Sequence, residues 1–99
     1  MKDVWIGQVG IWGQRHYQYL KENKPSVIGA MRISGNLKSY LSEVDEQAEE
    51  MLFQLVDQMA KAEGVTETLK RQNQMLWVQH MNSIRNRAEE IVSNTYIFV

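Results

Sequence analysis

Residues 36–63 read NLKSYLSEVDEQAEEMLFQLVDQMAKAE, and this stretch decides the fold. Its apolar side chains recur alternately four and three positions apart, which is the spacing of one face of an α-helix. Residues 66–96 repeat the pattern. The two stripes are formed by Leu37, Leu41, Val44, Ala48, Met51 and Leu55 in the first segment and by Trp77, Met81, Ile84, Ala88 and Ile91 in the second. We therefore predict two long amphipathic helices.

The connection between these segments is short and carries its own turn signals. Gly64 can adopt the left-handed conformation that ends a helix, with Val65 folding back on the last turn in a Schellman arrangement. Thr66 is a suitable N-cap for the second helix. Because so short a connection favours antiparallel neighbours, we predict a hairpin folded about Gly64. This register pairs Val44 with Ile84 and Leu37 with Ile91.

Two shorter helices are predicted upstream, within residues 13–35. Lys24 and Pro25 separate them, because proline restricts the residue before it and is tolerated in the first turn of the next helix. Residues 1–12 are an apolar segment that we expect to be extended. The whole chain, residues 1–99, is thus predicted to be a single all-α domain with four parts: the segment 1–12, the short helices in 13–35, and long helices over 36–63 and 66–96.

Helices of this length are longer than a compact globular domain of 99 residues is wide, since such a domain has a radius of gyration of only about 13 Å. We therefore expect a homodimer in which two hairpins form a helical bundle. Apolar side chains near both ends of the chain are the candidate interface, namely Trp12, Tyr96, Ile97 and Phe98.

Composition argues against catalysis. The chain has no cysteine, so it cannot use a cysteine nucleophile or a cysteine-bound metal, and its two histidines do not have metal-ligand spacing. His16 is interpreted as a surface or nucleic-acid contact, and His80 as a structural histidine beside the apolar stripe. We predict a non-enzyme without metal or cofactor. No segment has the length and hydropathy of a membrane span or signal peptide, so we expect a cytoplasmic protein.

Charge is segregated along the chain, although its formal net charge is only −1. Residues 1–41 carry six Lys/Arg and two Asp/Glu, whereas residues 42–69 carry one and eight. Arg and Lys neutralise phosphates, and aromatic side chains interleaved with them can stack on bases. The candidate nucleic-acid contacts are therefore Arg15, Lys21, Lys24, Arg32 and Lys38. The alternative is that the first forty residues simply pack onto the hairpin.

The acidic run of residues 43–50 also has two interpretations. Helical carboxylates can hold metal ions, but the paired Glu-x-x-His segments of di-iron bundles are missing. The hairpin register instead favours salt bridges from Glu43 and Glu46 to Arg85 on the second helix. An acidic face of the hairpin could also bind a protein partner.

Three stretches of the second half closely resemble the TnpV family of small proteins encoded in bacterial transposons and integrative elements. They are EGVTETLK at residues 63–70, QMLWV at residues 74–78 and MNSIRNRAEEI at residues 81–91. The resemblance covers about residues 13–94 and implies an accessory protein of a mobile element in a bacterial cytoplasm. The family has no established catalytic residues to transfer.

The function predicted from these observations is that of a non-enzymatic accessory or regulatory protein of a bacterial mobile element, associated with nucleic acid. The alternative is a protein–protein interaction module that binds a transposase, a host factor or a defence nuclease.

Overall fold

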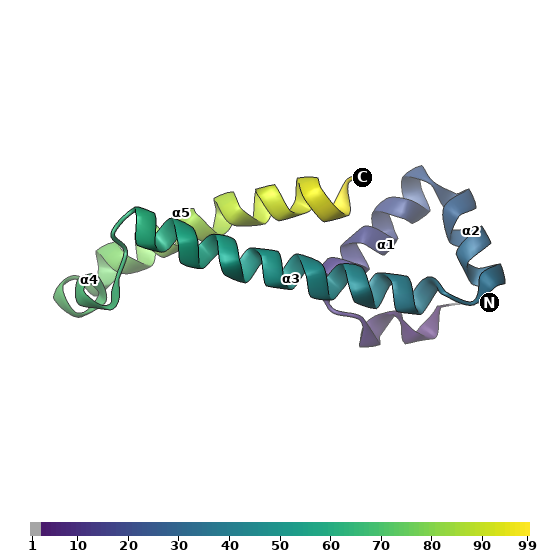
Figure 1. Cartoon of the computed structure of the whole chain (residues 1–99), viewed down its shortest axis with the longest axis horizontal. Coiled ribbons are helices and arrows are strands. Elements are labelled where there is room, and N and C mark those ends of the chain that lie inside the picture. Colours follow the sequence, from purple (N-terminus) through teal and green to yellow (C-terminus); the bar gives the residue numbers. More distant parts are fainter. Residues whose placement is uncertain (1–2) are drawn as a thin grey trace.

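The computed structural model describes residues 3–99, and every regular element in this range is helical (Figure 1). The predicted all-α class is therefore confirmed. In chain order the elements are the 3₁₀ helix η1 (Val4–Gln8), the α-helices α1 (Ile11–Asn23), α2 (Pro25–Ser34), α3 (Leu37–Ala62), α4 (Glu67–Gln72) and α5 (Gln74–Val92), and the π-helical turn η2 (Ser93–Ile97). The segment 1–12, expected to be extended, contains η1 and the start of α1; its residues 1 and 2 lie outside the described range.

Helix α3 ends as its sequence predicts. Gly64 has a φ of 71°, and the Val65 amide donates to the Ala60 carbonyl at 2.8 Å, which is the long hydrogen bond of a Schellman motif. Val65 is consequently buried. The hydroxyl of Thr66 accepts from the Leu69 amide at 3.4 Å, so Thr66 caps the next helix as expected.

The prediction of one long helix over residues 66–96 is wrong, because a break at Asn73 separates α4 from α5. The side-chain oxygen of Asn73 accepts from the Leu76 amide at 3.1 Å and so starts a new helix. Asparagine competes with the helical backbone for hydrogen bonds and favours such cap positions. At the other end, the last turn of the predicted helix is the π-helical turn η2.

This break shifts the pairing of the two long helices. Helix α3 ends at Ala62 and α5 begins only at Gln74, so the reversal of the chain extends over residues 63–73, which include α4, and is not a tight turn at Gly64 alone. The predicted pairing of Leu37 with Ile91 is wrong, because Leu37 packs with the N-terminal helices and Ile91 is 42% exposed. Cross-helix packing instead brings residues of α3 and α5 into one cluster, which contains Ala48, Leu52, Ala88 and Val92.

The predicted salt bridges from the acidic run to Arg85 are absent among residues 3–99. Arg85 lies 4.0 Å from Glu89 on its own helix. The ion pair that joins the two long helices is formed further along by Arg87 and Glu63, at 2.8 Å.

The core extends from one end of the molecule to its middle. Helices α1 and α2 cover the N-terminal half of α3, and α5 with η2 covers its middle (Figure 1). One buried cluster joins α1, α3, α5 and η2, and a second joins α1, α2 and the start of α3. The chain measures 55 × 22 × 17 Å and has a radius of gyration of 17.1 Å. It is therefore a rod with a thick, packed end and a thin end made of α3, α4 and α5.

Candidate nucleic-acid interface

Three of the five candidate cations gather around Asp3 at the thick end. Arg32 forms an ion pair with the Asp3 carboxylate, and the Tyr17 hydroxyl donates to the same group at 2.6 Å. The Lys21 ammonium lies 5.5 Å from the centre of the Tyr17 ring. Lys38 lines the same surface hollow as Asp3 and Arg32. The structure thus brings Lys21, Arg32 and Lys38 together around one carboxylate.

The titration behaviour of this cluster follows from its hydrogen bonds. Hydrogen bonding from Arg32 is the largest influence on the pKa of Asp3 and lowers it, and the Tyr17 hydroxyl and the Lys21 charge lower it further. Desolvation is the largest influence on the pKa of Tyr17 and raises it, and the bond to Asp3 adds to the rise. The carboxylate therefore stays ionised and cancels the charge of Arg32, so Arg32 is the least free of the three cations.

The lysines keep their charge uncompensated. The Lys38 ammonium donates to the neutral amide oxygen of Gln8 at 2.7 Å. Among the described residues neither Lys21, Lys24 nor Lys38 has a carboxylate within salt-bridge distance. Lys24 is exposed at the corner between α1 and α2, three positions after Lys21. The three lysines are therefore exposed charges at this end that a polyanion can reach.

Arg15 lies apart from this group. Six positions along a helix correspond to about 240° of rotation, so Arg15 projects from a different side of α1 than Lys21. Its guanidinium lies 5.0 Å from the centre of the Trp12 ring. Arg15 is therefore separated from the cluster around Asp3, and its role as a nucleic-acid contact stays a prediction.

Two of the four predicted interface residues are buried in the core, and the other two are partly or largely exposed. Trp12 is 2% exposed and its indole N–H donates to Glu49 at 3.0 Å, and Ile97 is fully buried. These two predictions are corrected, because both side chains belong to the core of their own chain. Tyr96 is half-buried against that core, and Phe98 is 57% exposed with its ring centre 5.8 Å from that of Tyr19. Of the four, Phe98 is the most exposed, and Tyr96 is partly exposed at a surface hollow.

His16 is not the surface contact that its neighbours suggested. It is 1% exposed, and its ring nitrogens pair with the Ile97 carbonyl at 2.9 Å and the Tyr40 hydroxyl at 2.8 Å. The side chain thereby joins α1 to α3 and to η2. His80, expected to be structural, is exposed on α5. The helical position of His16, four residues before the buried Leu20, was the available signal for its burial.

Asp45, within the acidic run, has a structural role that was not predicted from the sequence. The Asp45 carboxylate accepts from the amides of Trp12 and Gly13, both at 3.1 Å, and so caps the start of α1 from a different helix. A Cβ at Gly13 would lie 2.7 Å from the Leu41 carbonyl oxygen, and one at Gly10 would collide with Asp45. The spacing of Gly10 and Gly13 was the signal for this close approach of α1 to α3.

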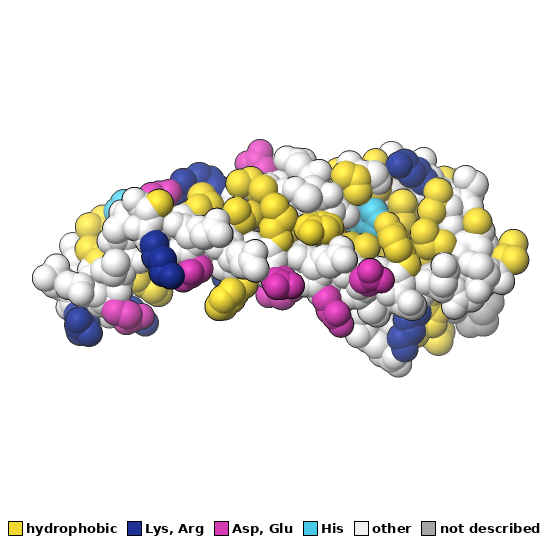
Figure 2. Space-filling model, viewed as in Figure 1, with side chains coloured by type: hydrophobic (Ala, Val, Ile, Leu, Met, Phe, Trp, Pro, Cys, Tyr) yellow, Lys and Arg dark blue, Asp and Glu magenta, His cyan; other side chains and the backbone are white. Residues whose placement is uncertain are grey.

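The remaining acidic side chains lie along α3 on the outside. Figure 2 shows carboxylates spread along the middle of the molecule, with Lys and Arg side chains toward its ends. Glu43, Glu46 and Glu50 are exposed, and within the described range none forms a salt bridge. No set of three His, Asp or Glu side chains in residues 3–99 is arranged to hold a metal ion. No helix in the described part of the chain has the length and apolar character needed to cross a membrane.

Comparison with known proteins gives one match. The family model described as "Transposon-encoded protein TnpV" matches residues 3–97. Neither the curated proteins nor the solved structures provide a significant match. The match spans every helix described above, including the basic thick end and the thin end.

Proposed function

Because the chain belongs to the TnpV family of transposon-encoded proteins, we propose that it is a non-enzymatic accessory or regulatory protein of a bacterial mobile element that binds nucleic acid in the cytoplasm. The observation that carries this proposal is the group of uncompensated lysines at the thick end, Lys21, Lys24 and Lys38. The proposal includes a homodimer, which would present two such basic surfaces to one nucleic acid.

The hydrogen bonds of the buried His16 support a non-catalytic role. Both ring nitrogens of His16 are used inside the fold, so neither can accept a proton from a substrate. The basic surface itself consists of lysines and an arginine, which neutralise phosphates but do not by themselves supply a base at neutral pH. The chemistry favoured there is binding.

The test is fluorescence anisotropy with a labelled DNA duplex and a single strand of the same length. If the three lysines each neutralise one phosphate, the affinity should fall by about 40-fold between ~50 and ~200 mM salt, because each neutralised phosphate contributes about 0.9 to the logarithmic slope. Lys21→Glu combined with Lys38→Glu should abolish measurable binding. Arg71→Glu with Arg85→Glu changes the net charge equally at other exposed sites and should retain it.

The proposal fails if neither the duplex nor the single strand binds at ~50 mM salt, where phosphate contacts are strongest. It also fails if the two double variants weaken binding equally, since this would mean that net charge rather than the thick end determines affinity.

A second candidate function is recognition of a protein by the acidic face of α3. The observation in its favour is that Glu43, Glu46 and Glu50 are exposed without cationic partners among the described residues. Such a face suits a basic surface on a transposase, a host factor or a defence nuclease. Nuclease-treated pull-down with the transposase of the same element tests it, and Glu43→Lys with Glu46→Lys should abolish capture. Capture that is lost on nuclease treatment would instead favour the nucleic-acid function.

A further inference from the structure

The thin end of the rod lacks a core of its own. We call residues 53–83 the arm; it contains the last turns of α3, all of α4 and the first half of α5. Within the arm only Val65 is buried, and Leu55, Val56 and Met59 are half-buried where they pack against the cluster that contains Leu52. Apolar side chains are instead exposed, including Phe53 at 75%, Met75 at 74% and Val78 at 41%. Two helices alone cannot enclose the apolar stripe that each of them carries.

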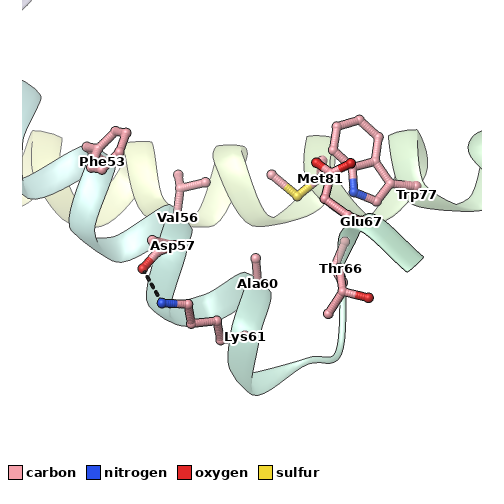
Figure 3. Close-up of a pocket in the computed structure, with 10 residues that line it drawn as sticks. Phe53, Val56, Asp57, Ala60, Lys61, Thr66, Glu67, Trp77 and Met81 are labelled. Atoms are coloured by element: carbon pink, nitrogen blue, oxygen red, sulfur yellow. Dashed lines mark ion pairs between the residues drawn. The ribbon is translucent and has the colours of Figure 1, made fainter. Parts of the chain in front are cut away.

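A groove runs between α3 and α5 in the arm. It has a volume of about 420 Å³, and its apolar lining includes Phe53 and Val56 from α3 and Trp77 and Met81 from α5. Figure 3 shows the α3 side chains standing on one side of the hollow and the α5 side chains on the other. The hollow is open to solvent in this chain.

Charges of opposite sign border the groove. On α3, Lys61 pairs with Asp57 at 3.0 Å, and its side chain is 77% exposed. Glu67, the first residue of α4, also lines the groove and is exposed. In a two-fold symmetric interface each contact occurs twice, because residue i of each copy faces residue j of the other. Lys61 and Glu67 in different parts of the border can therefore face each other across two copies.

The chain exposes more surface than a compact monomer of the same mass, and the excess is close to the area that each partner buries in a dimer. The chain exposes 6609 Å², whereas a compact monomer of its 11.6 kDa mass exposes about 5,800 Å². The excess is about 800 Å², which is the area that each partner contributes to an interface of standard size. The elongated shape of the molecule is the source of this excess.

We propose that the arm is a dimer interface and that its occupant is the arm of a second copy of this chain. Two arms pair about a two-fold axis, each Phe53 ring enters the groove of the other copy, and Lys61 meets the partner subunit's Glu67. The four helices then enclose the stripes that two helices leave open. This inference deepens the homodimer of the proposed function by naming the surface through which two copies associate, and it does not depend on nucleic-acid binding.

Analytical ultracentrifugation of the full chain without nucleic acid tests the proposal. The wild-type protein should sediment with twice its 11.6 kDa chain mass in the micromolar range. Phe53→Glu should weaken the dimer by at least about 10-fold, the effect of removing a central interface side chain. Ile33→Glu is the matched control, since Ile33 is 91% exposed but lies on α2, and it should leave the dimer unchanged.

A charge exchange provides an independent variant if Phe53→Glu lowers the helical content. Lys61→Glu and Glu67→Lys should each weaken the dimer, and the double variant should restore it. A monomeric wild type would overturn the proposal and leave the groove to a protein of another kind. Equal behaviour of the Phe53 and Ile33 variants, or no rescue by the charge exchange, would also overturn it. A dimer that fails to bind DNA would contradict only the nucleic-acid function.

Discussion

Replacing Gly13 by alanine tests how closely α1 must approach α3. In the middle of a helix, alanine is normally more favourable than glycine by about 1 kcal/mol. At Gly13, however, the new Cβ would lie 2.7 Å from the Leu41 carbonyl oxygen and would also collide with the Val9 side chain. A main-chain oxygen cannot rotate away, so α1 must move off α3.

The expected magnitude follows from these opposing contributions. Overpacking costs about 1–3 kcal/mol, and the gain in helix propensity offsets at most about 1 kcal/mol of it, so Gly13→Ala should lower the free energy of unfolding by up to about 2 kcal/mol. Gly29→Ala is the matched control, because Gly29 lies inside α2 and a Cβ there meets nothing within 4 Å. It should raise the free energy of unfolding by about 0.5–1 kcal/mol.

Urea and thermal unfolding followed by circular dichroism measure both variants at one protein concentration, since association would make the midpoint depend on concentration. The free energies of unfolding of the two variants should differ by about 0.5–3 kcal/mol, which corresponds to at least about 2 °C in Tm for a chain of this size. If Gly13→Ala is as stable as Gly29→Ala, then α1 does not lie as close to α3 as described, and the reasoning is refuted.

Three further predictions concern single side chains. Asp45→Ala removes the cap of α1 and should lower stability in urea unfolding by about 1 kcal/mol, whereas Glu46→Ala, an exposed carboxylate beside it, should change it by less than ~0.5. His16→Phe leaves a carbonyl and a hydroxyl without their partner and should cost about 2 kcal/mol in the same assay; a loss below that of Glu46→Ala would contradict its buried role. The pKa of Asp3 lies below its ordinary value of 3.8, chiefly because of the hydrogen bond from Arg32. The ionised Asp3 therefore stabilises the fold at pH values above 3.8, and this contribution is lost as the pH falls through the lowered pKa. Asp3→Asn should therefore be less stable than wild type at neutral pH and should converge with it in acid, and a constant difference in Tm at every pH would argue against the ion pair.

The features predicted correctly from the sequence are those that depend on neighbouring residues. The 4-and-3 spacing of α3, the left-handed Gly64 and the capping by Thr66 each need only a few consecutive positions to be recognised. The break at Asn73 was also local, but one asparagine inside a long periodic segment is a weak signal beside the apolar stripe on both sides of it. Missing it moved the predicted reversal of the chain and made the pairing of Leu37 with Ile91 wrong.

The candidate site was harder to predict because its residues interact across long stretches of sequence. Asp45 looked like any other member of an exposed acidic run, and its partners on α1 lie 32 and 33 positions earlier. Arg32 was predicted to be a free cation, but in the structure it pairs with Asp3, which lies 29 positions away in the sequence. Periodicity shows which face of a helix is buried, but it does not show which polar groups meet there.

The hydrogen bond between His16 and the Ile97 carbonyl also has a consequence for synthesis of the protein. It joins residues 81 positions apart, and Ile97 itself belongs to the cluster that buries Trp12 of α1. A ribosome releases α1 early, but the surface on which α1 comes to rest is complete only when the final turn of the chain has emerged. The contacts of α1 and α2 with the start of α3 can form early in translation, whereas the cluster that contains Trp12 and Ile97 is complete only after η2 has been synthesised.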